Sequence, residues 1–587
     1  TGGWVGLDLG EKHVISKVAY CPKKNEPYSS MLLGLFEGAN NPDFGDALPL
    51  FLISESPQEG IMTEQIINCS KGFRYVRYIG PNNARCNLAE LEFYGYKGEG
   101  DDSNLYQLTN LPTVTIHTTN AEDVVIKELY LKGIVSIISD NGTEIYTDSL
   151  DVRGRGNGSW EFPKKPYRMK LYNKASLLGF PAVEKSWTLI NNHGDKTLMR
   201  NLLAFDLSKR LEMPFTPAGK AVDVIFNGQY KGTYQLCDQM EVATGRVEVD
   251  KIKTSDIELP SITGGYLIEV DAYARFEPEQ SWFSSNVGIP VTIKYPKDDK
   301  IVPEQKTYIS SHFNEMETAL YSSNYADNEN GYRKYIDKQT FIRHFLIGEL
   351  SGNTDTYWSV YAYKNKNDDK FYFGPVWDFD LAYENDSHTY PINKLKDWVY
   401  KSGYSAHMMR NFVDRLFTDE TFVKEVQTVY ALYRDNNILS AEPLLQVVDD
   451  YARELNESQK LNFTRWNILN AVIHRNPQIY GSYEEEVENV KNYISGRIDW
   501  MDVKLKYKPA SINQDKDEDL VLVYSESNTL YIKNIDSETR INIYDLAGRN
   551  IYSREICDDI SLTLKKGTYI VDISSPSIKK QVKSIIL

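Results

Sequence analysis

Cysteine and histidine are scarce in this chain, and neither shows the spacing of a thiolate or zinc site. The 587 residues include five cysteines and eight histidines. The cysteines are scattered, odd in number and without CxxC spacing, so they indicate neither a disulfide framework nor a thiolate metal site. No HExxH pattern and no GxSxG nucleophile elbow occurs, which argues against hydrolases of those two kinds. Motifs do not exclude a glycosidase, because it needs only two acids and the chain has 82.

Long apolar runs and an excess of positive charge are also missing. No run reaches the roughly 18 apolar residues that a membrane span needs, so we expect no transmembrane segment. The formal net charge is −16 and the isoelectric point is about 5.2. This charge argues against nucleic acid or an anionic membrane as the main partner.

The chain is long enough for several domains. Its length exceeds what one hydrophobic core usually organises, so two to four domains are expected. Hydrophobic residues make up 41% and charged residues 25%, as in an ordinary soluble globular protein. Aromatic residues make up 12%, including 41 tyrosines. This richness suits surfaces that stack on sugars, but β-rich cores explain it better.

Two alternating aromatic runs, residues 357–363 and 371–377, predict a β-hairpin. Between them lies the polar, turn-forming stretch 364–370 (KNKNDDK). The midpoint between Asp355 and Asp378 falls in this turn. Antiparallel pairing is therefore expected to bring their carboxylates side by side at the open end of the hairpin.

Asp380 follows Asp378 by two residues, on the same face if the chain stays extended. Three acids at one rim are typical of a site for a divalent metal and a polyphosphate. The alternative is a surface hairpin whose acids only cap neighbouring backbone groups.

The first 97 residues predict a β-sandwich, because strand-like runs alternate with turn signals. Residues 4–10 (WVGLDLG) and 88–95 (LAELEFYG) resemble the opening and end of a discoidin-like (F5/8 type C) module. The resemblance implies binding of glycans or lipid headgroups through loops at one end. Residues 98–110 are predicted to form a linker.

Residues 520–587 predict about seven short alternating strands, after a second linker at 508–519. The runs 544–549 (YDLAGR) and 564–571 (LKKGTYIV) resemble the C-terminal sorting domain of the type IX secretion system, an Ig-like sandwich. This resemblance implies an exported protein, at the cell surface or extracellular, whose signal peptide is not part of the sequence. The alternative is a domain that serves only as a structural cap.

The middle of the chain, residues 111–507, combines strands with a helical lobe from about residue 405 onward. A glycine-rich turn at 153–160 (RGRGNGSW) precedes a strand that carries Lys170. Such a turn and lysine are a familiar, though weak, phosphate-binding signal. Asp195 is predicted to cap a helix over residues 196–211.

The same region resembles the CotH family, atypical protein kinases of the spore-coat type. Six blocks occur in the family's order: 153–160, 165–170 (KPYRMK), 198–201 (LMRN), 227–234, 264–269 (GGYLIE) and 376–380 (VWDFD). The predicted fold class is therefore multidomain α+β: an N-terminal β-sandwich, a central kinase-like α+β domain with a helical lobe, and a C-terminal Ig-like β-sandwich.

The resemblance implies ATP- and Mg²⁺-dependent phosphoryl transfer to protein hydroxyls. Asp355 would position the attacking hydroxyl, and Asp378 would bind Mg²⁺ with help from Asp380. Lys170 or Arg153 would contact the phosphates, although Lys170 is as readily explained as an exposed strand lysine.

Two positions depart from the family's pattern. A kinase-like site expects Asn within about five residues after the catalytic-loop acid, whereas residues 356–360 here are TYWSV. Asp238 also stands where the family usually has Glu. The chain is therefore either a monomeric atypical protein kinase acting on a protein substrate or a non-catalytic, pseudokinase-like surface protein that binds a glycan or a protein partner.

Overall fold

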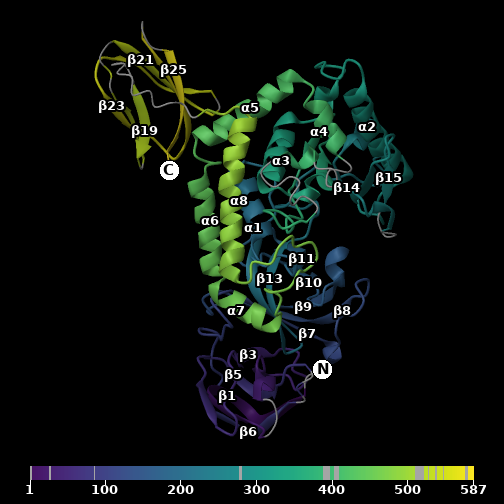
Figure 1. The fold of residues 1–587 in the computed structure, drawn as a ribbon, viewed down its shortest axis with the longest axis vertical. Coiled ribbons are helices and arrows are strands. Elements are labelled where there is room, and N and C mark those ends of the chain that lie inside the picture. Colours follow the sequence, from purple (N-terminus) through teal and green to yellow (C-terminus); the bar gives the residue numbers. More distant parts are fainter. Residues whose placement is uncertain are drawn as a thin grey trace. The chain divides into compact units, whose positions relative to one another are not determined.

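The computed structural model describes residues 3–24, 28–82, 84, 86–276, 281–387, 397–401, 409–508, 521–526, 528–533, 535, 538–546, 548–575 and 579–586. Two compact units are present, Thr1–Pro509 and Ala510–Leu587 (Figure 1). The prediction of a multidomain chain that mixes helices and sheets is confirmed. Apart from Lys508, the predicted linker at 508–519 lies outside the described residues.

The N-terminal segment is β-rich, as predicted, and its six strands belong to one sheet. The long strand β1 makes this possible, because it pairs with β5 before a bulge between Asp8 and His13 and mainly with β6 and β4 after it. The sheet order is β3-β2-β5-β1-β4, with β6 also on β1. The strands are β1 (Trp4–Pro22), β2 (Leu35–Ala39), β3 (Leu48–Leu52), β4 (Thr63–Ile66), β5 (Gly72–Ile79) and β6 (Leu88–Lys97).

A closed seven-stranded barrel follows, in the order β10-β11-β13-β12-β7-β8-β9. Pairing of β9 with β10 closes it, and β7 lies parallel to β12. The turn Asn227-Gly228 joins β12 to β13, and both residues have the positive φ that a type I′ turn requires, 51° and 70°. The strands are β7 (Thr113–Thr118), β8 (Leu131–Ile138), β9 (Ile145–Gly154), β10 (Tyr167–Ala175), β11 (Glu184–Ile190), β12 (Gly219–Phe226) and β13 (Gln229–Asp238).

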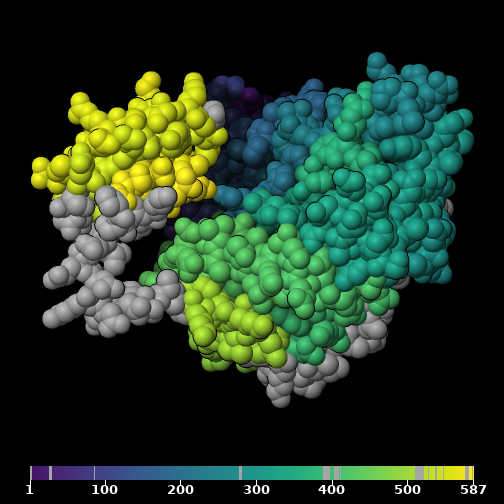
Figure 2. Space-filling view, turned by 90° about the horizontal axis from the view of Figure 1, so that it is seen from above, coloured from purple at the N-terminus to yellow at the C-terminus, as the bar shows by residue number. Residues whose placement is uncertain are grey.

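The predicted hairpin forms one edge of a second sheet, in the order β15-β16-β14-β17-β18. Ala362 pairs with Phe373 and Lys364 with Phe371, so the polar stretch between them is the turn. The strands are β14 (Tyr266–Asp271), β15 (Trp282–Ser284), β16 (Pro290–Tyr295), β17 (Ser359–Lys364) and β18 (Phe371–Phe373). One hydrophobic cluster joins this sheet to the helices. In Figure 2 their teal and green surfaces adjoin accordingly.

The first helix begins four residues later than predicted. Leu198 has a φ of 63°, which a helix does not accept, so the predicted helical stretch 196–199 is a turn. Asp195 still caps this turn, since its carboxylate accepts from the backbone N–H of Thr197 (3.0 Å) and of Arg200 (2.8 Å). The helices are α1 (Arg200–Arg210), α2 (Pro303–Tyr321), α3 (Lys338–Ser351), α4 (Arg410–Leu416), α5 (Glu420–Asp435), α6 (Ala441–Glu454), α7 (Asn456–Arg465) and α8 (Tyr483–Lys504).

The C-terminal unit consists of two small sheets that share one core. Their orders are β19-β20-β23 and β22-β21-β24-β25, and alternate residues such as Ile541, Ile543 and Val571 are fully buried. The described strands are β19 (Leu522–Glu526), β20 (Thr529–Lys533), β21 (Thr539–Asp545), β22 (Asn550–Ile556), β23 (Ile560–Thr563), β24 (Gly567–Ser574) and β25 (Lys579–Ile586). Over the described part of the whole chain, no helix combines the length and apolar character that crossing a membrane requires.

Candidate functional site

The open end of the β17–β18 hairpin places two carboxylates within range of each other. Asp355 lies in a short 3₁₀ helix (Thr354–Tyr357) directly before β17, and Asp378 follows β18 by five residues. Burial raises the pKa of Asp355 to about 8, and the negative charge of Asp378 adds to the rise. The positive charge of Arg475 opposes it.

Asp380 belongs to the same electrostatic group. Burial raises its pKa well above the usual range, and the charges of Asp378 and Asp355 contribute in the same direction. Desolvation by the surrounding protein also raises the pKa of Asp378, although this side chain reaches solvent. A bound cation would favour the ionised form of all three carboxyls.

Amide side chains hold the backbone of this acidic loop. Asp378 has a φ of 66°, a conformation that non-glycine residues adopt rarely and mostly at functional sites. The Nδ2 of Asn353 donates to the Asp378 carbonyl (3.2 Å), and the N–H of Phe379 donates to the Oδ1 of Asn201 on α1 (2.7 Å). The Nδ2 of Asn385 donates to the carbonyl of Asp380 (2.7 Å). The loop is therefore fixed from two helical regions and from within.

The acids fit Mg²⁺, which takes one or two carboxylates and completes its coordination with phosphate and water oxygens. Asp378 and Asp380, two residues apart in the chain, offer hard oxygen ligands. A divalent cation would relieve the repulsion that raises their pKa values. Among the residues that the structure describes, no group of three or more His, Cys, Asp or Glu side chains is already arranged to hold a metal ion.

The two cations predicted to meet phosphate lie on the barrel. Lys170 is exposed on β10, opposite Asp151 and Ser186 in the neighbouring strands. The guanidinium of Arg153 lies 4.9 Å from the ring centroid of Tyr130. Their roles as nucleotide-binding residues stay predictions, as do the roles of Asp355, Asp378 and Asp380.

Two charged groups near the acids escaped the sequence-based reasoning. The positive charge of Arg155, in the glycine-rich turn, opposes the rise in the pKa of Asp378. Glu269 on β14 acts on Asp378 in the opposite sense. Glu269 also accepts from the Oγ of Ser359 (2.7 Å), which stands where the family expects Asn, and pairs with Lys294 (2.7 Å). Arg155 and Glu269 lie in two of the six blocks that resemble the CotH family. Their place in these blocks is the sequence signal that could have identified them.

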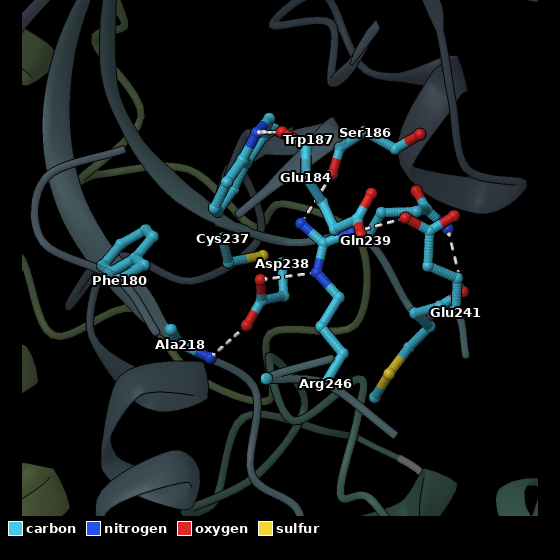
Figure 3. Close-up of polar contacts among 12 residues, drawn as sticks. Phe180, Glu184, Ser186, Trp187, Ala218, Cys237, Asp238, Gln239, Glu241 and Arg246 are labelled. Atoms are coloured by element: carbon cyan, nitrogen blue, oxygen red, sulfur yellow. Dashed lines mark hydrogen bonds and ion pairs between the residues drawn. The ribbon is translucent and has the colours of Figure 1, made fainter. Parts of the chain in front are cut away.

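Asp238, the other departure from the family's pattern, takes part in a buried ion pair (Figure 3). Its carboxylate accepts from the Nε of Arg246 (2.8 Å) and from the N–H of Ala218 (2.8 Å). Arg246 also donates to Glu241 (2.6 Å) and to the carbonyl of Ser186 (2.7 Å). Asp238 therefore ties the end of β13 to the following loop and to β11.

Comparisons with known proteins agree with the geometry of this region. No curated protein matches the chain. A solved structure described as CBM62 from Clostridium thermocellum Xyl5A is similar at 42% sequence identity, covering 16% of this chain and 70% of that chain with a TM-score of 0.16. Residues 152–501 match the family described as CotH kinase protein. Because this match runs from β9 to α8, covers more than half of the chain and includes the acids of the hairpin, the chain belongs to the CotH kinase protein family.

Proposed function

We propose that this protein transfers the terminal phosphoryl group of ATP to a hydroxyl of a protein substrate, in the presence of Mg²⁺. The observation that supports the proposal is the meeting of Asp355 and Asp378 at the open end of the hairpin, with Asp380 beside them. Phosphoryl transfer requires mainly positioning and charge stabilisation, and this arrangement supplies carboxylates for both.

Each acid has a separate role in the proposed reaction. Asp355 accepts a hydrogen bond from the attacking hydroxyl and takes its proton, while ADP leaves. Asp378 and Asp380 hold Mg²⁺, which when bound neutralises charge on the phosphate oxygens. Glu269 holds Ser359 at the start of β17 and so supports the position next to Asp355 from the neighbouring strand.

Nucleotide binding is tested by the thermal stability of the full chain with ATP and Mg²⁺ against Mg²⁺ alone. A ligand at 100 times its Kd stabilises a protein by about 2.7 kcal/mol. We expect a clear rise in Tm for the parent protein and none for Asp378→Ala. Transfer is then followed with ATP labelled at the terminal phosphate and a protein acceptor.

Asp369→Ala is the matched control, because Asp369 is an exposed acid at the turn end of the same hairpin. It should keep both the shift and the transfer. Absence of a nucleotide-dependent shift in the parent protein would refute the proposal. A shift without transfer would identify a pseudokinase.

The second candidate is binding of a surface glycan by the N-terminal sheet. Trp4 is 57% exposed, and its ring lies 6.1 Å from that of Phe44 and 5.8 Å from the guanidinium of Arg77. An exposed aromatic platform beside a cation is typical of sugar stacking. Electrophoresis in gels containing soluble polysaccharides should show retardation that Trp4→Ala abolishes and that Tyr172→Ala, at an exposed tyrosine of the barrel, preserves.

We also propose that the protein is exported and acts as a monomer at the cell surface or outside the cell. The support is the compact C-terminal unit with its two small sheets, in the segment that resembles a sorting domain. Fusion of residues 510–587 to a reporter in a bacterium with type IX secretion tests this. Retention of the reporter inside the cell would contradict export through this domain and favour the alternative, a domain that serves only as a structural cap.

A further inference from the structure

The outer face of the barrel carries a row of arginines on β9 and β10. Arg153 pairs with Arg168, and the N–H of Arg155 donates to the carbonyl of Pro166 (3.3 Å), one step further along the same ladder. Alternate residues of these strands fill the barrel core. The three arginines therefore share the opposite, outer face.

Two of these arginines have unused hydrogen-bond donors. Within the described part of the chain, the guanidinium groups of Arg155 and Arg168 meet no hydrogen-bonding or ion-pair acceptor, and the Nε of Arg168 is buried. Burial lowers the pKa of Arg168, and the positive charges of Arg153 and Arg155 act in the same direction, while Tyr130 and Glu241 oppose the shift. A buried donor without an acceptor costs free energy, which an anion between the arginines would recover.

Arg246, in the loop after β13, shows the contrast (Figure 3). Its Nε, Nη1 and Nη2 donate to Asp238, to Glu241 and to the carbonyl of Ser186. A structural arginine of this barrel thus receives carboxylate and carbonyl partners from the chain. Arg155 and Arg168 receive none from the described residues, which points to a ligand as their partner.

Arg155 also connects this row to the acidic loop. Its guanidinium lies 5.7 Å from the ring centroid of Trp377, the residue directly before Asp378. The Trp377 ring packs in turn on Phe205 of α1, at a centroid distance of 6.2 Å. Arg155 is therefore directed toward the loop that carries the metal-binding acids.

We propose that Arg155 and Arg168 bind the phosphate chain of the nucleotide, Arg155 next to the phosphate that the Asp378 side holds and Arg168 further along the barrel face. Arginine suits this role because its planar donors grip two phosphate oxygens at once. The inference rests on the proposed function for the identity of the ligand. It assigns the phosphate contacts to a different pair than Lys170 and Arg153, which the sequence indicates.

Binding of inorganic tripolyphosphate to the full chain, by titration calorimetry, tests the inference without a nucleoside. We expect Arg155→Gln and Arg168→Gln each to weaken binding about 10-fold or more, and Arg155→Lys to lose less, because it keeps the charge without the paired donors. Lys174→Ala is the control: Lys174 lies on the same strand and pairs with Glu184 at the surface. Melting curves of all variants establish that they are folded. If Arg155→Gln does not fold, Arg155→Lys still tests whether the paired donors of Arg155 contribute to binding.

Two results would overturn the inference: no tripolyphosphate binding by the parent protein, or a loss in Lys170→Ala with none in Arg155→Gln. The companion measurement is the KM for ATP in the transfer assay. Transfer with an unchanged KM in Arg155→Gln refutes the arginine assignment and leaves the kinase proposal standing. Binding of tripolyphosphate that depends on Arg155, without any phosphoryl transfer, supports the arginine assignment and refutes the kinase proposal.

Discussion

Arg200 shows how a single buried charge organises the candidate site. Its guanidinium pairs with the carboxylate of Asp195, and both side chains are buried. The Nε of Arg200 also donates to the carbonyl of Ala382 (3.0 Å). One arginine therefore fixes the turn before α1 and the loop that follows the acids.

Replacing Arg200 should be strongly destabilising. In Arg200→Met, the buried carboxylate of Asp195 loses its partner, which typically costs about 3–5 kcal/mol. Arg210→Met is the comparison, because the pair of Arg210 with Asp206 is partly solvated and worth about 1 kcal/mol or less. Urea denaturation of both variants measures the difference. Equal midpoints would contradict the role assigned to Arg200.

His344 on α3 is expected to make the protein sensitive to acid. Burial lowers its pKa to about 4, from an ordinary value of 6.5. The unfolded chain therefore takes up a proton at this residue between pH 6.5 and 4, while the folded protein resists protonation. The associated stability is complete above pH 6.5 and is lost as the pH falls to 4, by up to about 3 kcal/mol.

His344→Leu checks this window. Urea midpoints measured from pH 7.5 to 4 should fall less steeply for the variant than for the parent protein. Parallel curves would show that His344 is not the group responsible.

The sequence predicts that acidic side chains come together at the hairpin, but it does not predict which charged residues from distant segments contact them. The hairpin register followed from period-2 patterning, and with it the approach of Asp355 to Asp378. Glu269 comes from β14 and Arg155 from the turn after β9, both more than 80 residues earlier in the chain. Only the pairing of β14 with β17 and the closing of the barrel bring them to the same place.

At the scale of elements, helix α7 is tied to the barrel through one buried lysine. The Nζ of Lys164 donates to the carbonyl of Thr233 (2.6 Å) and to the Oδ1 of Asn462 on α7 (2.8 Å). The N–H of Thr233 donates to the same Oδ1 (3.2 Å). Buried hydrogen bonds within an apolar interface therefore connect the helical lobe to the barrel.

Asn462→Leu should destabilise the protein by about 3 kcal/mol, because it leaves the Lys164 ammonium and the Thr233 N–H without this acceptor. The double variant Lys164→Met/Asn462→Leu should recover part of the loss, since both polar partners are then gone. Thr464→Val, on the exposed side of the same helix, should change the unfolding free energy by less than about 0.5 kcal/mol. A double variant as unstable as the sum of its single changes would contradict the coupling.

At the scale of the whole molecule, the N-terminal sheet is built into the first unit. Gln229 of the barrel accepts from the N–H of Asn82 (2.9 Å) and donates to the carbonyl of Gly80 (2.9 Å). The predicted linker at 98–110 also carries tertiary contacts, since the Oγ1 of Thr109 donates to Asp223 (2.6 Å). A buried apolar cluster joins the sheet, the barrel and α7: Leu33, Leu35, Leu52, Ile79, Ile225, Tyr230 and Leu461.

Removing the two ends of the chain should therefore have different effects. Deletion of residues 1–110 exposes Ile225, Tyr230 and Leu461, so the remaining protein should melt several degrees lower or aggregate. Deletion from residue 510 onward should leave the melting temperature of the first unit unchanged. Calorimetry of both truncations measures this, and an unaltered melting transition after the first deletion would contradict it.

The sequence by itself determined the order of β-rich, mixed and helical segments, the acidic hairpin and the family resemblance, because these depend on local periodicity, turn chemistry and short motifs. Closing of the barrel, the pairing of β1 with three other strands and the late start of α1 were decided by tertiary structure. So were the raised pKa values of the three acids and, among the residues that the structure describes, the lack of an acceptor for the guanidinium groups of Arg155 and Arg168. The physical reason is that burial and long-range electrostatics depend on which distant strands become neighbours, and local sequence does not encode that choice.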